Sequence, residues 1–284
     1  MRLLALTLAV STLASPQSPV RTPVNCTFEL VQKLDLSCSV DDPCPLYLEL
    51  TDAETVGERI VLVGNIHTPR ETLESILLVS DDGGKTWNEG HARISAGVLT
   101  AIQFIDFEAG WISGHVLRPD ARDPFFLITS DGGKTWRRRP VYSEPKTGGV
   151  EQFRFASRTS GKMIVDRGQA GENGLRYELY ESLTSGDSWS IRQVDGKPIP
   201  FPDAAPVVKP LRIRADGASK TYRIERQEGN QWRALAAFTV SPADAPSGLP
   251  QRGGDVGLAQ WLHCVVAPGS AVRRNQDTQG RFGL

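Results

Sequence analysis

The amino-acid sequence predicts an all-β fold, a β-propeller of about four or five blades, each a sheet of four antiparallel strands. The first observation is an eight-residue turn at residues 80–87 that recurs at 129–136 and, in weaker form, at 182–189. The second is the interval of about 50 residues between these turns, which is typical of repeat architectures. The third is the constant order of short alternating segments around each turn.

Each turn has the composition of a hairpin corner that satisfies its own hydrogen bonds. The hydroxyl and carboxylate oxygens can accept hydrogen bonds from turn amides, the glycine permits a positive φ, and the tryptophan can bury an apolar face. The structural residues predicted across the three copies are Ser80, Asp82, Gly84, Thr86, Trp87, Thr129, Asp131, Gly133, Thr135, Trp136, Ser182, Thr184, Gly186, Ser188 and Trp189. Because Thr184 replaces the aspartate of the other copies, we expect the third corner to be less well capped and more mobile.

Short apolar and β-branched segments predict four strands in each of the first three units. They are residues 47–51, 59–65, 75–80 and the stretch after Trp87 in the first unit, 99–105, 111–117, 125–130 and 137–141 in the second, and 150–156, 162–166, 177–182 and 190–194 in the third. Four strands in a constant order are the pattern of a propeller blade.

A fourth copy of the turn is weaker and follows from register alone. Glu225, Gln227, Gly229, Gln231 and Trp232 stand where the first copy has Ser80, Asp82, Gly84, Thr86 and Trp87. The predicted repeat units are about residues 45–95, 96–145, 146–197 and 205–240, inside a propeller domain of residues 26–268. The proline-rich stretch 198–210 joins the last two units. The sequence leaves open whether residues 26–44 and 250–270 complete a blade or form a fifth unit.

The two ends of the chain read as segments outside the fold. Residues 1–14 carry one arginine, a short apolar run and then small residues, which is the layout of a secretory signal peptide. The apolar run is shorter than the roughly 20 residues that span a bilayer, so no transmembrane anchor is expected. Residues 15–25 read as a spacer and residues 269–284 as a flexible tail. We therefore expect an exported protein, either periplasmic or extracellular.

Four cysteines follow the expected cleavage site, at Cys26, Cys38, Cys44 and Cys264. An even number in an exported chain predicts two disulfides. All three possible pairings join Cys264 to an N-terminal cysteine, and closing a loop of more than about 200 residues contributes about 5 kcal/mol in the chain-entropy model. One local disulfide with two free thiols is the alternative that the sequence leaves open.

The composition and the spacing of residues do not indicate nucleic-acid binding, a metal site or a pair of catalytic carboxylates. The net charge of −1 offers no nucleic-acid footprint, and the basic run at residues 137–139 reads as a solvated strand edge. The histidines, which are His67, His91, His115 and His263, lack metal-ligand spacing. Asp82 and Asp131 belong to the corners of different blades and are expected to cap turns. No catalytic residue, cofactor site or metal site is therefore predicted.

The turns resemble the Asp-box, or BNR, repeat that is found in sialidases and sortilin-type receptors. A longer pattern at residues 102–104, 110–114 and 128–136 (Ile-Gln-Phe, Gly-Trp-Ile-Ser-Gly and Ile-Thr-Ser-Asp-Gly-Gly-Lys-Thr-Trp) is most similar to repeats of the photosystem II stability and assembly factor-like family. Members of that family are propellers that act as non-catalytic assembly platforms. The resemblance covers about residues 45–195 and implies a type of hairpin without implying a particular function.

We predict a non-catalytic scaffold that binds a protein or peptide, because propellers present loops around a shallow depression. One alternative is a sialidase-like glycoside hydrolase, which would need arginines, a tyrosine paired with a glutamate, and a general acid. The candidates are Arg212, Arg214, Tyr177 or Tyr222, and Glu178 or Glu225, and they do not form that family's pattern. The other alternative is a carbohydrate-binding module with Trp111 or Trp261 as the platform, although both read first as core residues.

Overall fold

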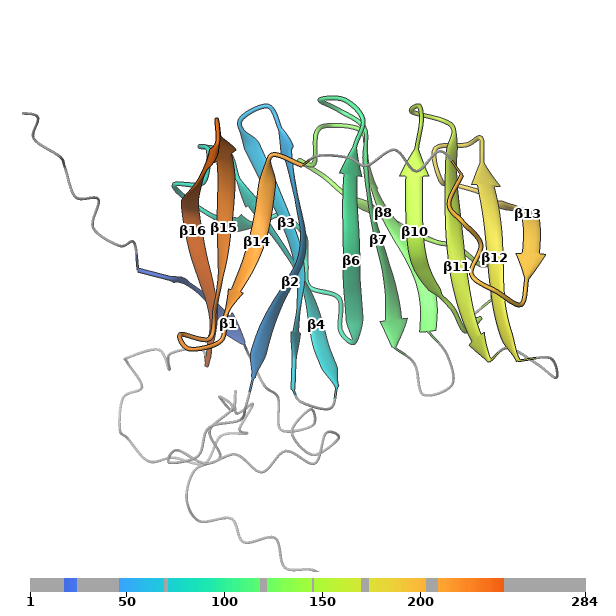
Figure 1. Ribbon diagram of the computed structural model, residues 1–284, viewed down its shortest axis with the longest axis horizontal. Helices are drawn as coiled ribbons and strands as arrows, with labels where there is room; N and C mark the ends of the chain where they lie inside the picture. The colour runs from blue at the N-terminus through green and yellow to red at the C-terminus, as the bar shows by residue number, and fades with distance from the viewer. Residues whose placement is uncertain are drawn as a thin grey trace, which may run out of the picture.

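The computed structural model describes residues 18–24, 46–68, 71–117, 122–144, 146–169, 174–202 and 209–242. Within these ranges the chain contains no helix, and 16 strands form four sheets of four strands each. The sheets stand side by side as blades (Figure 1). The predicted fold class, an all-β propeller with four-stranded blades, is confirmed. The predicted signal peptide, the four cysteines, Trp261, His263 and the C-terminal tail lie outside the described residues.

The first three blades repeat one order of strands. The first blade holds β2 (Tyr47–Val56), β3 (Arg59–His67), β4 (Thr72–Ser80) and β5 (Asn88–Glu89); the second holds β6 (Gly97–Phe104), β7 (Gly110–Leu117), β8 (Arg122–Thr129) and β9 (Arg137–Pro140); the third holds β10 (Gly149–Phe155), β11 (Gly161–Gln169), β12 (Leu175–Ser182) and β13 (Ser190–Asp195). Neighbours in the chain are neighbours in the sheet, and every pair is antiparallel. Each strand predicted in these units is present, with small differences in its bounds.

The fourth blade recruits the N-terminal part of the chain. It contains β14 (Leu211–Asp216), β15 (Thr221–Glu228), β16 (Gln231–Pro242) and β1 (Val20–Val24), and β1 pairs with β16 in parallel. The prediction of a spacer over residues 15–25 is therefore wrong for this stretch. Val20 packs on the core, and Thr22 is buried and donates its hydroxyl to the Thr239 carbonyl at 2.9 Å. A strand this short among prolines and serines has no pattern that the sequence alone reveals.

In the fourth blade, β14, β15 and β16 run opposite to the strands at the same positions in the other blades. The start of β14 and the end of β2 line the same groove, at Pro210 and Thr55. Figure 1 accordingly shows β14 pointing opposite to β6 and β10. The strands β14, β15 and β16 thus match the second, third and fourth strands of the other blades. The turn between Glu228 and Gln231 lies on the side of the repeated turns, but it is a tight hairpin with Gly229 at φ 60°.

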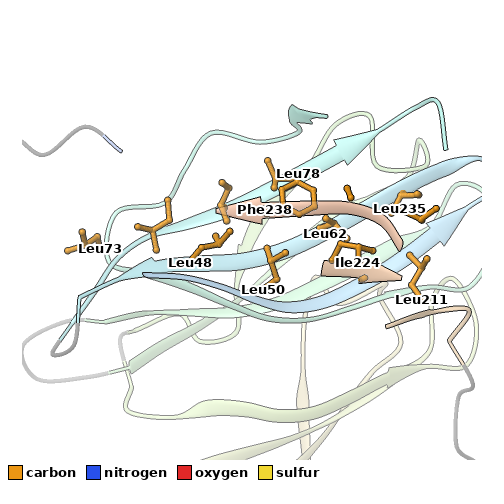
Figure 2. Close-up of a cluster of buried hydrophobic side chains, with 14 residues drawn as sticks. Leu48, Leu50, Leu62, Leu73, Leu78, Leu211, Ile224, Leu235 and Phe238 are labelled. Carbon is orange, nitrogen blue, oxygen red and sulfur yellow. The ribbon is translucent and has the colours of Figure 1, made fainter. Parts of the chain in front are cut away.

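Apolar clusters fix the order of the blades. One cluster joins the fourth blade to the first, with Phe238 and Ile224 against Leu62 and Leu78 (Figure 2). A second cluster joins the first blade to the second, and a third joins the second to the third. The order in space is therefore fourth, first, second, third. The third and fourth blades lie at opposite ends of the row (Figure 1), and within the described residues no core cluster joins them.

Side-chain amides bind the backbone of the neighbouring blade. Asn65 on β3 is 1% exposed; it accepts a hydrogen bond from the Leu99 amide at 2.8 Å and donates one to the Leu99 carbonyl at 3.2 Å. Gln103 on β6 binds the amide and carbonyl of Phe155 on β10 in the same way, at 2.8 and 3.0 Å. These contacts satisfy backbone groups on the edge of each inner strand, where no further strand pairs.

A charged pair makes a third contact of this kind. Asp52 on β2 accepts a hydrogen bond from the Ile102 amide at 2.9 Å, and Lys209 donates to the Ile102 carbonyl at 3.1 Å. The ammonium group of Lys209 also binds both carboxylate oxygens of Asp52 at 2.7 Å. Because Lys209 lies just before β14, this pair ties the beginning of the fourth blade to the first two.

We expect Asn65→Ala to lower the free energy of unfolding by about 1–3 kcal/mol, because it leaves the buried Leu99 amide without its partner, while the Leu99 carbonyl keeps the hydrogen bond from the Thr51 hydroxyl. Denaturant titration followed by far-ultraviolet circular dichroism measures this loss. Asn88→Ala, which changes an exposed asparagine on β5, is the control and should stay within about 0.5 kcal/mol of the wild type. Equal stability of the two variants would show that the Asn65 contact does not hold the blades together.

Candidate functional site

The repeated turns form one side of the molecule, called here the turn face. It comprises residues 80–87, 129–136 and 182–189 together with the strand corners 57–58, 105–109 and 156–160. In the first turn, Asp82 accepts hydrogen bonds from the amides of Lys85 and Thr86, each at 2.9 Å. The hydroxyl of Ser80 donates to Asp82 at 2.8 Å and accepts from the Gly84 amide at 2.7 Å. Hydrogen bonds from Thr86 above all hold the pKa of Asp82 well below its usual range.

The second turn repeats this arrangement and the third departs from it. Asp131 accepts from the amides of Lys134 and Thr135 at 3.0 and 2.9 Å. Thr184, at the corresponding place in the third turn, accepts through its hydroxyl from a single turn amide, that of Ser188, at 2.9 Å. The side chain at this place therefore caps one turn amide instead of two, while the Asp187 amide donates to the Thr184 carbonyl at 3.0 Å, and the greater mobility of the third corner stays a prediction.

The tryptophans of the turns seal the junctions between blades. Trp87, Trp136 and Trp189 are half-buried, and each packs in the junction with the preceding blade. Trp111 lies deeper: it is 1% exposed, stacks on Phe155 at a centroid distance of 3.8 Å, and donates to the Ser185 carbonyl at 2.8 Å. Trp111 is thus a core residue and has no open ring face for a sugar.

The corner at residues 105–109, between β6 and β7, has a fixed backbone. Asp106 accepts hydrogen bonds from the amides of Glu108 and Ala109 at 2.8 and 2.7 Å, and these bonds lower its pKa. The Gly132 amide donates to the Glu108 carbonyl at 2.9 Å. From the third blade, Arg158 binds the carboxylates of Asp106 and Glu108, both at 2.7 Å. The corner is therefore held both by its own blade and by the next one.

Phe107 stands at the tip of this fixed corner with 76% of its surface exposed. Its ring lies near Gly57 of the first blade, where a Cβ atom would be 3.8 Å from the ring. Its carbonyl faces Gly132, where a Cβ atom would come within 2.6 Å of the oxygen. The absence of a side chain at Gly132 therefore lets the corner sit close to the second turn while the ring projects into solvent.

A groove of about 460 Å³ runs between the first and second blades beside Phe107. Its lining residues are Val56, Arg59, Phe107, Glu108, Ser130, Asp131, Gly132 and Lys134. Arg59 is fixed by Asp81 at 2.6 Å and by the Gly132 carbonyl at 3.0 Å. Lys134 is exposed and makes no ion pair with any of the described residues. The groove thus combines an exposed aromatic ring, a rigid wall and an available ammonium group.

A second cluster of ionisable groups lies at the other end of the third blade. Glu178 is 2% exposed, accepts a hydrogen bond from the Tyr180 hydroxyl at 2.6 Å and pairs with Arg176 and Arg167. Burial raises the pKa of Glu178, but the bonds from Tyr180 and Arg176 outweigh burial and the net pKa is lowered. Burial and the bond to Glu178 raise the pKa of Tyr180. The Tyr180 phenol therefore donates to a buried carboxylate that two arginines also hold.

The structure does not bring the glycoside hydrolase candidates together. Tyr177 and Glu178 lie on the third blade and point to opposite faces of it. Tyr177 belongs to the cluster with Ile164 and Ile199, whereas Glu178 binds Tyr180 of the cluster that the third blade shares with the second. The others, which are Arg212, Arg214, Tyr222 and Glu225, lie on the fourth blade at the far end of the row. Arg212 pairs with Glu225 at 2.6 Å on its own sheet.

The remaining candidates are separate from one another. The exposed Arg137 and Arg139 bind Asp187 of the third blade at 2.6 and 3.0 Å. Burial and then the charge of Arg122 lower the pKa of His115 to about 4. Among the described residues, no three acidic, histidine or cysteine side chains are grouped as a metal site would require. No described helix could cross a bilayer.

No protein-family model matches the chain, and no curated protein matches it. One similar solved structure is YCF48 bound to D1 peptide, at 20% identity and a TM-score of 0.35, covering 70% of this chain and 60% of that one. Another is the alpha-L-arabinofuranosidase Arb93A from Fusarium graminearum in complex with an iminosugar inhibitor, at 13% identity and a TM-score of 0.35, covering 72% and 59%. The chain thus spans less than two thirds of either protein, and these likenesses do not bear on its function.

Sequence reasoning missed Phe107. A single aromatic residue between strands carries no periodic signal, and the repeat directs attention to the turn tryptophans. One available signal is its context, Asp106-Phe107-Glu108, because two flanking acids in a strand connection favour an outward position.

We expect the stabilising effect of the Asp131 carboxylate to depend on pH. Burial raises the pKa of Asp131, but hydrogen bonds from Thr135 and the rest of the turn outweigh burial and lower the pKa to about 2. A carboxyl whose pKa is lower in the folded state contributes stability above about pH 4, and this contribution is lost as the pH falls through about 2. Asp131→Asn should therefore melt below the wild type at neutral pH, with a difference that shrinks between about pH 4 and pH 2.

Differential scanning calorimetry across this pH range measures the effect. Glu58→Gln, which removes an exposed carboxylate from the neighbouring corner, serves as the control and should track the wild type throughout. A melting difference for Asp131→Asn that stays constant down to pH 2 would contradict the role assigned to the ionised carboxylate.

Proposed function

We propose that this protein is a non-catalytic β-propeller scaffold that binds a protein or peptide partner on its turn face, with Phe107 as the anchor of the contact. The observation that carries this proposal is a 76% exposed phenylalanine on a fixed corner beside a groove of about 460 Å³. Contiguous apolar patches rimmed by polar residues mark protein interaction sites, and Phe107 and Val56 form the apolar part of this groove. Aromatic anchors at such sites contribute much of the binding free energy.

The rigidity of the site supports the same proposal. The backbone around Phe107 is held by Asp106 from within the corner, by Gly132 from the second turn and by Arg158 from the third blade. A preformed anchor loses little conformational entropy on binding, so more of the contact energy appears as affinity. The free ammonium group of Lys134 adds a charged contact at the edge of the groove.

We also assign the turns to the Asp-box, or BNR, type, on the hydrogen bonds that Asp82 and Asp131 make within them. We further expect export to the periplasm or the medium, as the leader-like residues 1–14 predict. Fractionation of cells that express the full chain, with mass spectrometry of the N-terminus, tests the export and the cleavage.

A glycoside hydrolase remains the alternative function, and the geometry gives it less support. The candidate acid Glu178 is bonded to Tyr180, which is not one of the candidates; Glu178 is 2% exposed and Tyr180 6%, so a sugar would have to displace the packed side chains around them. The pKa of the phenol is raised and that of the acid is lowered, which is the reverse of what a nucleophile and a general acid need.

We expect a photo-crosslinking amino acid at position 107 to capture a specific partner from extracts of the native cells, because the ring lies at the centre of the proposed contact. The matched control is position 183, since Leu183 is also an exposed apolar residue of the turn face, 64% exposed, and lines no described groove. Phe107→Ala should then weaken binding of the captured partner about 30-fold, and Leu183→Ala less than about 3-fold. Equal capture or equal loss at both positions would overturn the assignment of this site.

A further inference from the structure

The row of blades ends in two faces that no other blade covers within the described residues. At each of the three internal junctions, one blade packs its turn tryptophan in the junction with the blade before it. The fourth blade has no blade before it, and the third has none after it (Figure 1). Each end face is therefore left without the partner blade that the internal junctions have.

The end face of the fourth blade is rich in arginine. This arginine face consists of Arg212, Arg214, Arg223, Glu225 and Trp232, which lie opposite the cluster shown in Figure 2. Trp232 corresponds by register to the turn tryptophans that fill the internal junctions. Here it has no preceding blade, and the guanidinium of Arg212 lies 4.2 Å from its ring centroid.

The arginine face carries more positive charge than its described carboxylates neutralise. Arg214 and Arg223 stand directly opposite each other on β14 and β15, and both are exposed. Arg223 binds Asp216 at 2.9 Å, whereas Arg214 makes no ion pair with the described part of the chain. Like charges directly opposite each other destabilise a sheet, and an acidic surface laid against them would offset this cost.

The end face of the third blade carries carboxylates in the half that is remote from the repeated turns, whereas Arg154 and Lys162 face the same way in the half near the turns. In the acidic half, Tyr177 stands between Asp166 and Asp195 on the neighbouring strands. The apolar centre of the face is covered by Ile199 and Phe201 from the connection to the fourth blade. The two carboxylates remain at its margin, and neither makes an ion pair with the described residues.

The two charged rows lie at the same height on their sheets. Arg214 and Arg223 lie in the half of the fourth blade that is remote from the turn face, because β15 begins there at Thr221. Asp166 and Asp195 lie toward the ends of β11 and β13, again remote from the repeated turns. Stacking the faces in the order of the internal junctions therefore places arginines opposite aspartates.

We propose that a second copy of this chain docks on these faces, with the third blade of each copy against the fourth blade of the other. The pair forms a two-fold ring of eight blades, which lies within the range of about four to eight that propellers use. A closed pair makes the same contact twice and leaves no end face free, unlike an open chain of copies. This surface is distinct from the Phe107 groove, which lies between the first and second blades.

The test is the mass of the purified full chain by size-exclusion chromatography with light scattering, over a range of concentrations at low salt. We expect a dimer. Arg214→Glu and Asp195→Lys should each raise the dissociation constant about 10-fold or more, because each places like charges in contact. An equal mixture of the two variants should restore the dimer, since one contact is then unchanged and the other is a reversed ion pair.

Several results separate this proposal from others. Both substitutions change exposed residues, so unchanged melting curves show that the variants are folded. Lys85→Glu, in the first turn, is the charge-matched control and should leave the dimer intact.

A monomer at every concentration, or a dimer that both variants preserve, overturns the proposal. If the protein is a monomer and Trp232 is protected from hydroxyl-radical oxidation, another segment of the same chain covers the arginine face and the proposal is wrong. Phe107→Ala should not change the mass, so the partner site is tested independently.

Discussion

Burial of both faces of each inner sheet is the constraint on which the rest of the structure depends. On β3, Ile60 and Leu62 face the fourth blade while Val61 faces the second, and all three are 0% exposed. A sheet that is apolar on both sides cannot be stable alone, so it must lie between two others. The polar contacts between blades follow from this stacking, because the backbone of Leu99 loses water at the junction and takes the buried Asn65 amide instead.

The same close stacking shapes the surface that we connect with function. Ties between blades, such as Arg158 to Asp106 and Arg59 to Gly132, cross the turn face and immobilise its corners. The corner at residues 105–109 then holds the Phe107 ring exposed beside the groove. The second turn therefore both stabilises its blade and lines the groove at which we propose binding. Binding surfaces of this kind are common in folds whose loops vary on a constant framework.

The fourth blade shows how far a repeat can change while the stacking rule still holds. It lacks a strand with the direction of β2, and β1 from the other end of the chain takes the outer position beside β16. Its inward residues, among them Phe238, still meet the first blade. Its outward residues are charged, and the connection covers the apolar centre of the third blade. The two ends of the row thus differ from the internal junctions, which are apolar on both sides.

The sequence by itself determined the repeat, the four-stranded blades and the chemistry of the turns, because these depend on local patterns: alternation of apolar residues, and serine, aspartate and glycine at fixed offsets within eight residues. Only the tertiary structure decided the order of the blades, the place of Val20–Val24 in the fourth sheet and the exposure of Phe107. Each of these depends on contacts between residues far apart in the chain. The energy of such contacts comes from buried area and from partners that no local window contains, so no local pattern records them.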